Sequence, residues 1–156
     1  GANEIFWLEV PGCIHRYHAA LIRPVWLGDP PDLFVKATQV TFNTMLTATS
    51  AIKPGVRAEQ ISDLIQESLI QGLGLKKDFR SAYSIGIGFP PDWGEGHIFS
   101  IVKGEHRPLE SGMVFHLSTD LDVPGLGSAG FSDTVLVTDD GCEILTDGLE
   151  LKFYVK

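Results

Sequence analysis

The sequence is short of cysteine, of positive charge and of long apolar runs. It has two cysteines, Cys13 and Cys142, and no Cys-x-x-Cys pair, so nothing demands a disulfide or a zinc ribbon. Lys and Arg number 12 against 20 Asp and Glu, a net charge of -8, which argues against a nucleic-acid partner because phosphate binding needs a basic surface. No apolar run approaches the length of a membrane span and no signal peptide is visible after Gly1. We therefore expect a cytoplasmic protein with neither a membrane nor a nucleic-acid partner.

Several common catalytic motifs are also missing. The sequence has no His-Glu-x-x-His, no phosphate-binding P-loop and no Gly-x-Ser-x-Gly. The pair Gly86 and Gly88 lacks the third glycine and the helix of a dinucleotide site. His15 and His18 are three residues apart, so on one strand they would point to opposite faces and could not share a metal ion. We expect no cofactor.

What is present indicates one domain of the α+β class. The chain has 156 residues, of which 44% are hydrophobic, enough for a real core. Strand-like runs come first, two helical stretches follow, and mainly antiparallel strands complete the order. The expected helices span 32–52 and 61–72, and the expected strands span 5–10, 13–27, 98–102, 113–117, 131–138, 142–145 and 151–155. Pro11-Gly12 is expected to interrupt the first two strands, and Asp139-Asp140-Gly141 predicts a hairpin turn.

The stretch from Tyr83 to Glu95 is the least regular part of the sequence. Three glycines and the pair Pro90-Pro91 exclude a long helix or a regular central strand. We interpret this stretch as a strand that ends in a loop carrying acids and a tryptophan. Such a loop is typical of a small-molecule pocket, but it is equally compatible with a surface turn whose acids have no function. Around it stand acids and histidines, the usual groups for proton transfer or covalent attack: Glu9, His15, His18, Asp92, Glu95, His97, His116, Asp120 and Asp133.

Four segments together resemble the catalytic domain of the pita-bread superfamily. They are Lys-Pro-Gly-Val at 53–56, Leu-Glu-Ser-Gly-Met-Val-Phe at 109–115, the run from Asp133 to Gly141, and Leu145-Thr146. That superfamily contains methionine aminopeptidase, Xaa-Pro peptidases, creatinase and ectoine hydrolase. The resemblance covers nearly the whole chain from Glu4 onward. The segments 12–18, 23–28 and 90–95 look most like ectoine hydrolase.

The peptidases of this superfamily hold two metal ions with two Asp, one His and two Glu. The positions that match these ligands carry Glu9, Ala20, Ile85, Ser118 and Ser132. Ala and Ile supply no donor atom, and Ser hydroxyls are poor substitutes for carboxylates. The resemblance therefore implies a metal-free hydrolase of the creatinase and ectoine hydrolase type. Two alternatives stay open, a metal-dependent Xaa-Pro peptidase and a non-catalytic relative.

Ectoine is a cyclic amidine that carries a carboxylate, and the resemblance implies hydrolytic opening of such a ring. An amidinium carbon is already electrophilic, so a carboxylate can pair with it or attack it. We expect Glu9 to be the nucleophile or the base. Further catalytic candidates are His15, His18, Glu95 and His97. Substrate contacts are expected from Arg23 or Arg16, Phe89, Asp92, Trp93 and His116.

In the superfamily, another helix pair precedes the strand that holds the first ligand. We therefore expect residues 1–156 to be one partial catalytic domain, truncated at its amino-terminal side. The resemblance also implies a homodimer, with a missing amino-terminal domain contributing to the site.

Overall fold

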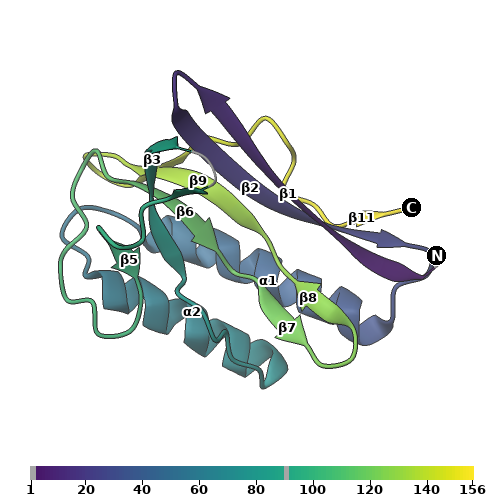
Figure 1. Ribbon diagram of the computed structural model, residues 1–156. Helices are drawn as coiled ribbons and strands as arrows, with labels where there is room; N and C mark the ends of the chain where they lie inside the picture. The colour runs from purple at the N-terminus through teal and green to yellow at the C-terminus, as the bar shows by residue number, and fades with distance from the viewer. Residues whose placement is uncertain (1–2, 90–91) are drawn as a thin grey trace.

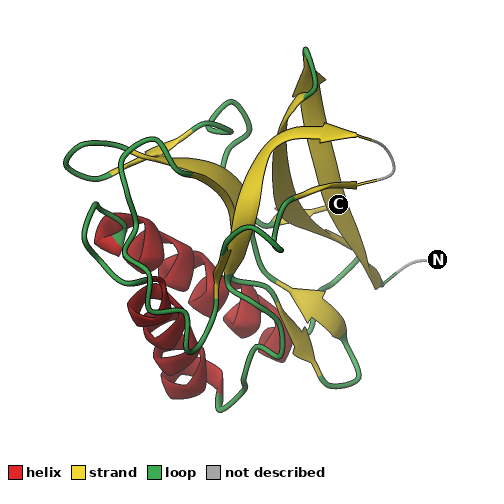
Figure 2. Cartoon of the chain, turned by 60° about the vertical axis from the view of Figure 1, so that its left-hand side comes forward, coloured by secondary structure: helices red, strands yellow, loops and turns green. Residues whose placement is uncertain are grey.

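Two helices cover one face of a curved, mostly antiparallel sheet (Figures 1 and 2). This computed structural model describes residues 3–89 and 92–156. Gly1-Ala2 and the Pro90-Pro91 part of the predicted loop lie outside the described residues. The α+β prediction is confirmed. Within the described chain, neither helix combines the length and the hydropathy needed to cross a membrane.

The first two strands form one long hairpin. Strand β1 (Glu4–Ile14) pairs with β2 (Tyr17–Leu27) without interruption from Glu4 opposite Leu27 to Ile14 opposite Tyr17. His15 and Arg16 make the turn with φ values of 51° and 72°, as a two-residue hairpin turn with two positive φ angles requires. The predicted break at Pro11-Gly12 and the predicted strand over 13–27 are therefore wrong. Pro11 is tolerated because β1 is an edge strand, where a missing N–H is least costly.

Both predicted helices are confirmed with small changes at their ends. Helix α1 spans Asp32–Ala51 and α2 spans Ala58–Leu73. Gly74, at φ 70°, ends α2 in the left-handed region and donates its N–H to the Ile70 carbonyl at 2.8 Å. The apolar stripes of both helices, with Phe34 and Ile65 among them, pack on Phe115 and Val135 of the sheet.

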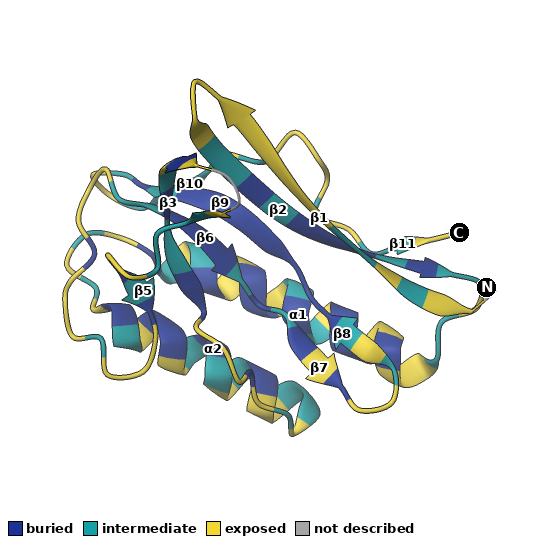
Figure 3. Ribbon diagram, in the orientation of Figure 1, coloured by how far each residue is buried: buried dark blue, intermediate teal, exposed yellow. Residues whose placement is uncertain are grey.

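The main sheet has the order β1-β2-β3-β6-β9-β10, with β4 and β5 paired to β3 and β11 paired to β2, while β7 and β8 form a separate two-stranded sheet. Their bounds are β3 Ala82–Phe89, β4 Asp92–Gly94, β5 Ser100–Ile101, β6 Val114–Ser118, β7 Leu121–Val123, β8 Gly127–Ala129, β9 Ser132–Val137, β10 Cys142–Ile144 and β11 Tyr154–Val155. The predicted β9–β10 hairpin is confirmed, whereas the strands expected over 98–102 and 151–155 shorten to β5 and β11. Strand β2 also pairs with β9 through Ile22 and Ser132. The tip of the β1–β2 hairpin is exposed (Figure 3), and the Arg16 carbonyl in its turn accepts the Gly88 N–H of β3 at 2.9 Å.

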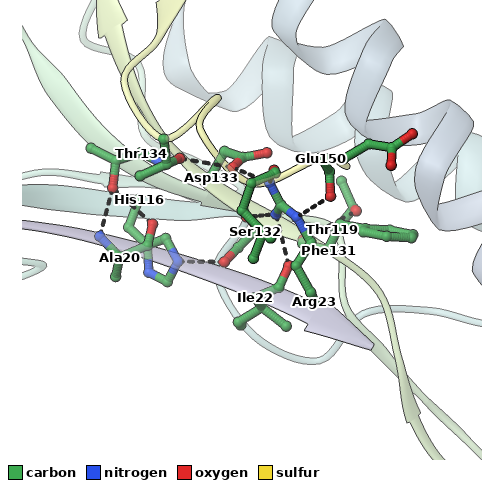
Figure 4. Close-up of polar contacts among 12 residues, drawn as sticks. Ala20, Ile22, Arg23, His116, Thr119, Phe131, Ser132, Asp133, Thr134 and Glu150 are labelled. Carbon is green, nitrogen blue, oxygen red and sulfur yellow. Dashed lines mark hydrogen bonds and ion pairs between the residues drawn. The ribbon is translucent and has the colours of Figure 1, made fainter. Parts of the chain in front are cut away.

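Arg23 fastens β2 to β9 in the buried interior (Figure 4). Its side chain is 1% exposed, and its Nη2 lies 2.8 Å from Oδ1 of Asp133, which is equally buried. The same guanidinium donates to four carbonyl oxygens at 2.8–3.0 Å, those of Ile22, Ser132, Leu149 and Glu150. Next to it, the Ala20 N–H donates to Thr134 Oγ1 at 2.8 Å, and that hydroxyl donates back to the Ala20 carbonyl at 2.9 Å.

These bonds correct the expectation that Arg23 holds a substrate carboxylate. Five hydrogen bonds to protein acceptors use all the N–H groups of the guanidinium. Arg23 therefore has a structural position, joining β2, β9 and the segment 149–150.

Replacing Arg23 by Met is expected to lower the free energy of unfolding by about 3–5 kcal/mol, because it leaves the Asp133 carboxylate buried without its cation. Urea unfolding followed by circular dichroism measures the loss. The matched control is Lys152→Met, which removes a cation from an exposed ion pair with Glu150 and should cost at most about 0.5 kcal/mol. Adding Asp133→Leu to Arg23→Met should cost less than the sum of the single changes, and additive losses would contradict the pairing.

Candidate functional site

A cavity of about 260 Å³ opens beside the β2–β9 junction. Strands β1, β2, β3 and β6 and the segment 77–81 supply its walls. Trp7 and Ile22 are apolar members of the lining. The polar and charged side chains are Glu9, Lys77, Arg80, Ser81, Tyr83, His116, Ser118 and Asp120. The sequence-based candidates Glu9 and His116 are thus brought together.

Glu9 reaches the cavity from the edge strand. It shares a face of β1 with Trp7, two residues earlier, and lies opposite Ile22 in the register. The residue is exposed on the open side, and its carboxylate makes no hydrogen bond or ion pair with another described residue. Partial burial, and then the nearby Asp120 carboxylate, raise the pKa of Glu9 above its ordinary value. A carboxylate with a raised pKa is a better proton acceptor.

His116 is the centre of a hydrogen-bonded chain behind the cavity. Its Nδ1 lies 2.7 Å from the Tyr83 hydroxyl. Its Nε2 lies 2.5 Å from Ser132 Oγ (Figure 4). Trp93 donates its indole N–H to the same Tyr83 oxygen at 3.2 Å. Burial lowers the pKa of His116 to about 4, so the ring is neutral at pH 7, with one nitrogen donating and the other accepting. Burial also raises the pKa of Tyr83, which keeps the phenol protonated. The chain can therefore pass a proton to or from the cavity.

A buried cation lies at the floor of the cavity. Lys77 Nζ donates to Asp120 Oδ1 at 2.5 Å and to the Asp120 carbonyl at 3.0 Å, and its side chain is 3% exposed. Ser118 donates its hydroxyl to the same Oδ1. Gln66 fixes the Lys77 backbone by accepting its N–H at 3.2 Å and donating to its carbonyl at 2.6 Å. The ammonium therefore has a fixed place beside Ser118.

The residues present do not fit a dinuclear metal site. Of the five positions matched to metal ligands, only Glu9 offers a free carboxylate. Ala20 and Ile85 are aliphatic, Ser118 donates to Asp120, and Ser132 bonds to His116. No cluster of three or more His, Cys, Asp or Glu side chains suited to a metal ion occurs in residues 3–89 and 92–156. The Asp120 carboxylate is already paired with the Lys77 ammonium, so it is not a free ligand for a cation.

Most of the other sequence-based candidates lie outside the cavity lining. His15 sits in the exposed turn between β1 and β2, and His97 is exposed after β4. His18 lies against β3, where a Cβ on Gly88 would be 3.0 Å from its Nδ1. The Glu95 N–H donates to the Ser84 carbonyl at 2.7 Å.

The predicted substrate contacts on β3 and β4 also lie outside the cavity lining, although one of them is hydrogen-bonded to a lining residue. Phe89 is 61% exposed, with the Arg16 guanidinium 4.7 Å above its ring. Asp92 accepts the Gly94 N–H at 2.8 Å in a local turn. Trp93 connects with the cavity through its hydrogen bond to Tyr83. Roles in catalysis for these residues stay predictions.

Sequence reasoning missed Tyr83, Lys77 and Arg80 as cavity residues. Tyr83 stands at the start of β3 with no motif around it, and Lys77 and Arg80 belong to the irregular segment after α2. Strand alternation alone indicates that Trp7 shares the face of Glu9.

The neutral state of His116 predicts how stability depends on pH. Because the pKa is about 4 when folded and about 6.5 when unfolded, the unfolded chain takes up the proton first as the pH falls. The neutral His116 ring therefore makes its full contribution to the free energy of unfolding above pH 6.5. This contribution, up to about 3 kcal/mol, is lost as the pH falls toward 4. His116→Gln should remove this part of the pH dependence in urea unfolding, whereas His97→Gln, an exposed control, should retain it. Equal slopes for wild type and His116→Gln would contradict the burial of a neutral ring.

Comparison with known proteins shows which family the chain belongs to. Residues 1–139 match the family model for Metallopeptidase family M24. Ectoine hydrolase from Halomonas elongata is 34% identical over 145 residues, which are 93% of this chain and 36% of that protein. Agropine synthesis cyclase from Rhizobium rhizogenes is 34% identical over 138 residues, which are 86% of this chain and 34% of that protein.

Solved structures share the fold. X-Pro aminopeptidase from Thermotoga maritima superimposes with a TM-score of 0.86 at 22% identity, over 97% of this chain and 42% of that chain. Prolidase from Thermococcus sibiricus superimposes with a TM-score of 0.88 at 19% identity, over 100% of this chain and 41% of that chain. The chain thus spans about a third of the length of the curated relatives above. The resemblance inferred from the sequence is confirmed: the chain belongs to the M24 metallopeptidase family and has its pita-bread fold.

Proposed function

We propose that this protein hydrolyses a C–N bond in a small cyclic amidine, of the kind that ectoine presents, with a protein carboxylate in place of metal ions. The observation that carries the proposal is Glu9, an unpaired carboxylate at a cavity whose other matched ligand positions offer no suitable donor. The names of two relatives, ectoine hydrolase and agropine synthesis cyclase, support chemistry at a non-peptide ring.

The substrate's own charge makes this chemistry feasible. The two nitrogens of an amidinium share a positive charge with the carbon between them, so this carbon accepts a nucleophile without a Lewis acid. Glu9 pairs with the amidinium and then serves as the nucleophile or as the base that takes a proton from water. Its raised pKa favours the base.

In the base route, the water oxygen bonds to the amidinium carbon while Glu9 takes the water proton. The resulting tetrahedral carbon holds a hydroxyl and both ring nitrogens. One C–N bond then breaks, and the departing nitrogen takes a proton from Tyr83. The hydroxyl gives its proton back to the phenolate as the amide carbonyl forms, and the Glu9 proton leaves with the amine as ammonium. His116 holds Tyr83 in place for this exchange at 2.7 Å.

Replacing Glu9 by Gln keeps the shape of the side chain and removes the base. Ectoine turnover is expected to fall by about 10²–10⁴-fold, measured by chromatography of the ring-opened product. Glu143→Gln, which changes an exposed glutamate on β10, should keep the wild-type rate. Equal rates for Glu9→Gln and wild type, with both folded by circular dichroism, would refute the role of Glu9. Absence of turnover by wild type would favour a non-catalytic relative.

Chelation tests the absence of a metal requirement separately. After dialysis against EDTA, ectoine turnover is expected to stay within about twofold of the untreated rate, because the site lacks the ligands that two ions need. Activity that disappears and then returns with Mn²⁺ or Co²⁺ would contradict the proposal and favour a metal-dependent enzyme. A parallel assay with an Xaa-Pro dipeptide identifies that alternative directly.

A further inference from the structure

Three cations lie in or beside the cavity, and two of them are already paired. Arg23 is bound to Asp133 in a buried ion pair, and Lys77 is bound to Asp120 in a partly buried one. Arg80, which lines the cavity, makes no ion pair and no hydrogen bond with another described residue. Its guanidinium donors are therefore available to a ligand.

Arg80 is nevertheless held in one place. Its guanidinium carbon lies 4.9 Å from the centre of the Tyr83 ring, in a cation–π contact. On another side, Gly96 leaves space for it, since a Cβ at position 96 would lie 2.1 Å from Arg80 Nη1. An exposed arginine that is stacked on a ring and fitted over a glycine loses less conformational freedom when it binds an anion.

The free charge of opposite sign in the same cavity is Glu9. Tyr83 relates the two, because Glu9 raises and Arg80 lowers the pKa of its phenol. The unpaired Glu9 carboxylate and the unpaired Arg80 guanidinium thus both interact electrostatically with Tyr83, a residue of the cavity lining. A ligand with a cationic end and an anionic end would complement both charges.

We propose that Arg80 binds the carboxylate of a small zwitterionic substrate whose amidinium end faces Glu9. This inference rests on the proposed function and adds to it a specificity-determining residue. A planar guanidinium can bind a carboxylate with two parallel N–H donors, which fixes orientation as well as affinity. Arg80 therefore selects amidines that carry a carboxylate over otherwise equal rings that lack one.

The test compares ectoine with 2-methyl-1,4,5,6-tetrahydropyrimidine, the same ring without the carboxylate. Stopped-flow quenching of tryptophan fluorescence reports binding before turnover, because Trp7 lines the cavity. Wild type is expected to bind ectoine about tenfold more tightly than the plain ring. Arg80→Gln should abolish this preference while leaving the affinity for the plain ring within about twofold.

Two further variants separate position from charge. Gly96→Ala keeps the arginine but should displace its guanidinium, and is expected to reduce the preference as Arg80→Gln does. Arg107→Gln, the matched control, removes a guanidinium that stacks on Phe99 outside the cavity lining and should keep the full preference.

The outcomes distinguish this inference from the proposed function. A wild type that binds both rings equally, or neither, overturns the role of Arg80, as does an Arg80→Gln variant that keeps the preference. Ectoine turnover that does not depend on Arg80 has the same meaning and leaves the hydrolase standing. Arg80-dependent binding of ectoine with no turnover supports the role of Arg80 and refutes the hydrolase.

Discussion

The junction between β2 and β9 determines the arrangement of the site. The two strands meet where Ile22 pairs with Ser132, and the buried Arg23–Asp133 pair holds them there. Ile22 lies opposite Glu9 on β1, and Ser132 bonds to His116 on β6. One junction therefore sets the separation of Glu9 from the hydrogen-bonded chain through His116. A buried ion pair is weak evidence for stability by itself, and we infer that its contribution here is to the choice of strand partners.

In our proposal, the cavity keeps the position of the family's metal site and uses side chains in place of metal ions. In the matched positions, hydroxyls bind other protein groups, Ser118 to Asp120 and Ser132 to His116. A lysine ammonium, Lys77, supplies a fixed positive charge in the same cavity. A substrate that brings its own delocalised cation needs a carboxylate to receive it, and in our proposal Glu9 does so. A bound metal ion and a substrate that carries its own positive charge are thus two alternative ways to make the reacting carbon electrophilic.

Local signals in the sequence were sufficient for the helices and one hairpin. The spacing of Ile61, Ile65 and Leu69 indicates the buried stripe of α2, and Asp139-Asp140-Gly141 indicates the β9–β10 turn. The β1–β2 turn was missed because His15 and Arg16 are unusual at positive φ, where Asn and Gly are preferred. The predicted break at Pro11 was wrong because a proline interrupts a central strand but is tolerated at an edge. Only the tertiary structure shows that β1 is an edge strand.

The site was predictable only where a motif match pointed to it. Glu9 follows from its match to a ligand position, and His116 from its place in the strand after Met113. Arg80 and Lys77 carry no such signal, because an irregular segment brings them to the cavity only in the folded chain. Arg23 was assigned to the substrate because burial and saturation of its donors depend on partners more than 100 residues away.

Calorimetric titration of the protein with Mn²⁺ tests the central claim most directly, because it asks whether this donor set can hold the ions of a metallopeptidase. The account predicts no stoichiometric binding at micromolar metal, with or without ectoine present. Binding of two Mn²⁺ ions per chain by the wild type, lost in the Glu9→Gln variant, would contradict the account.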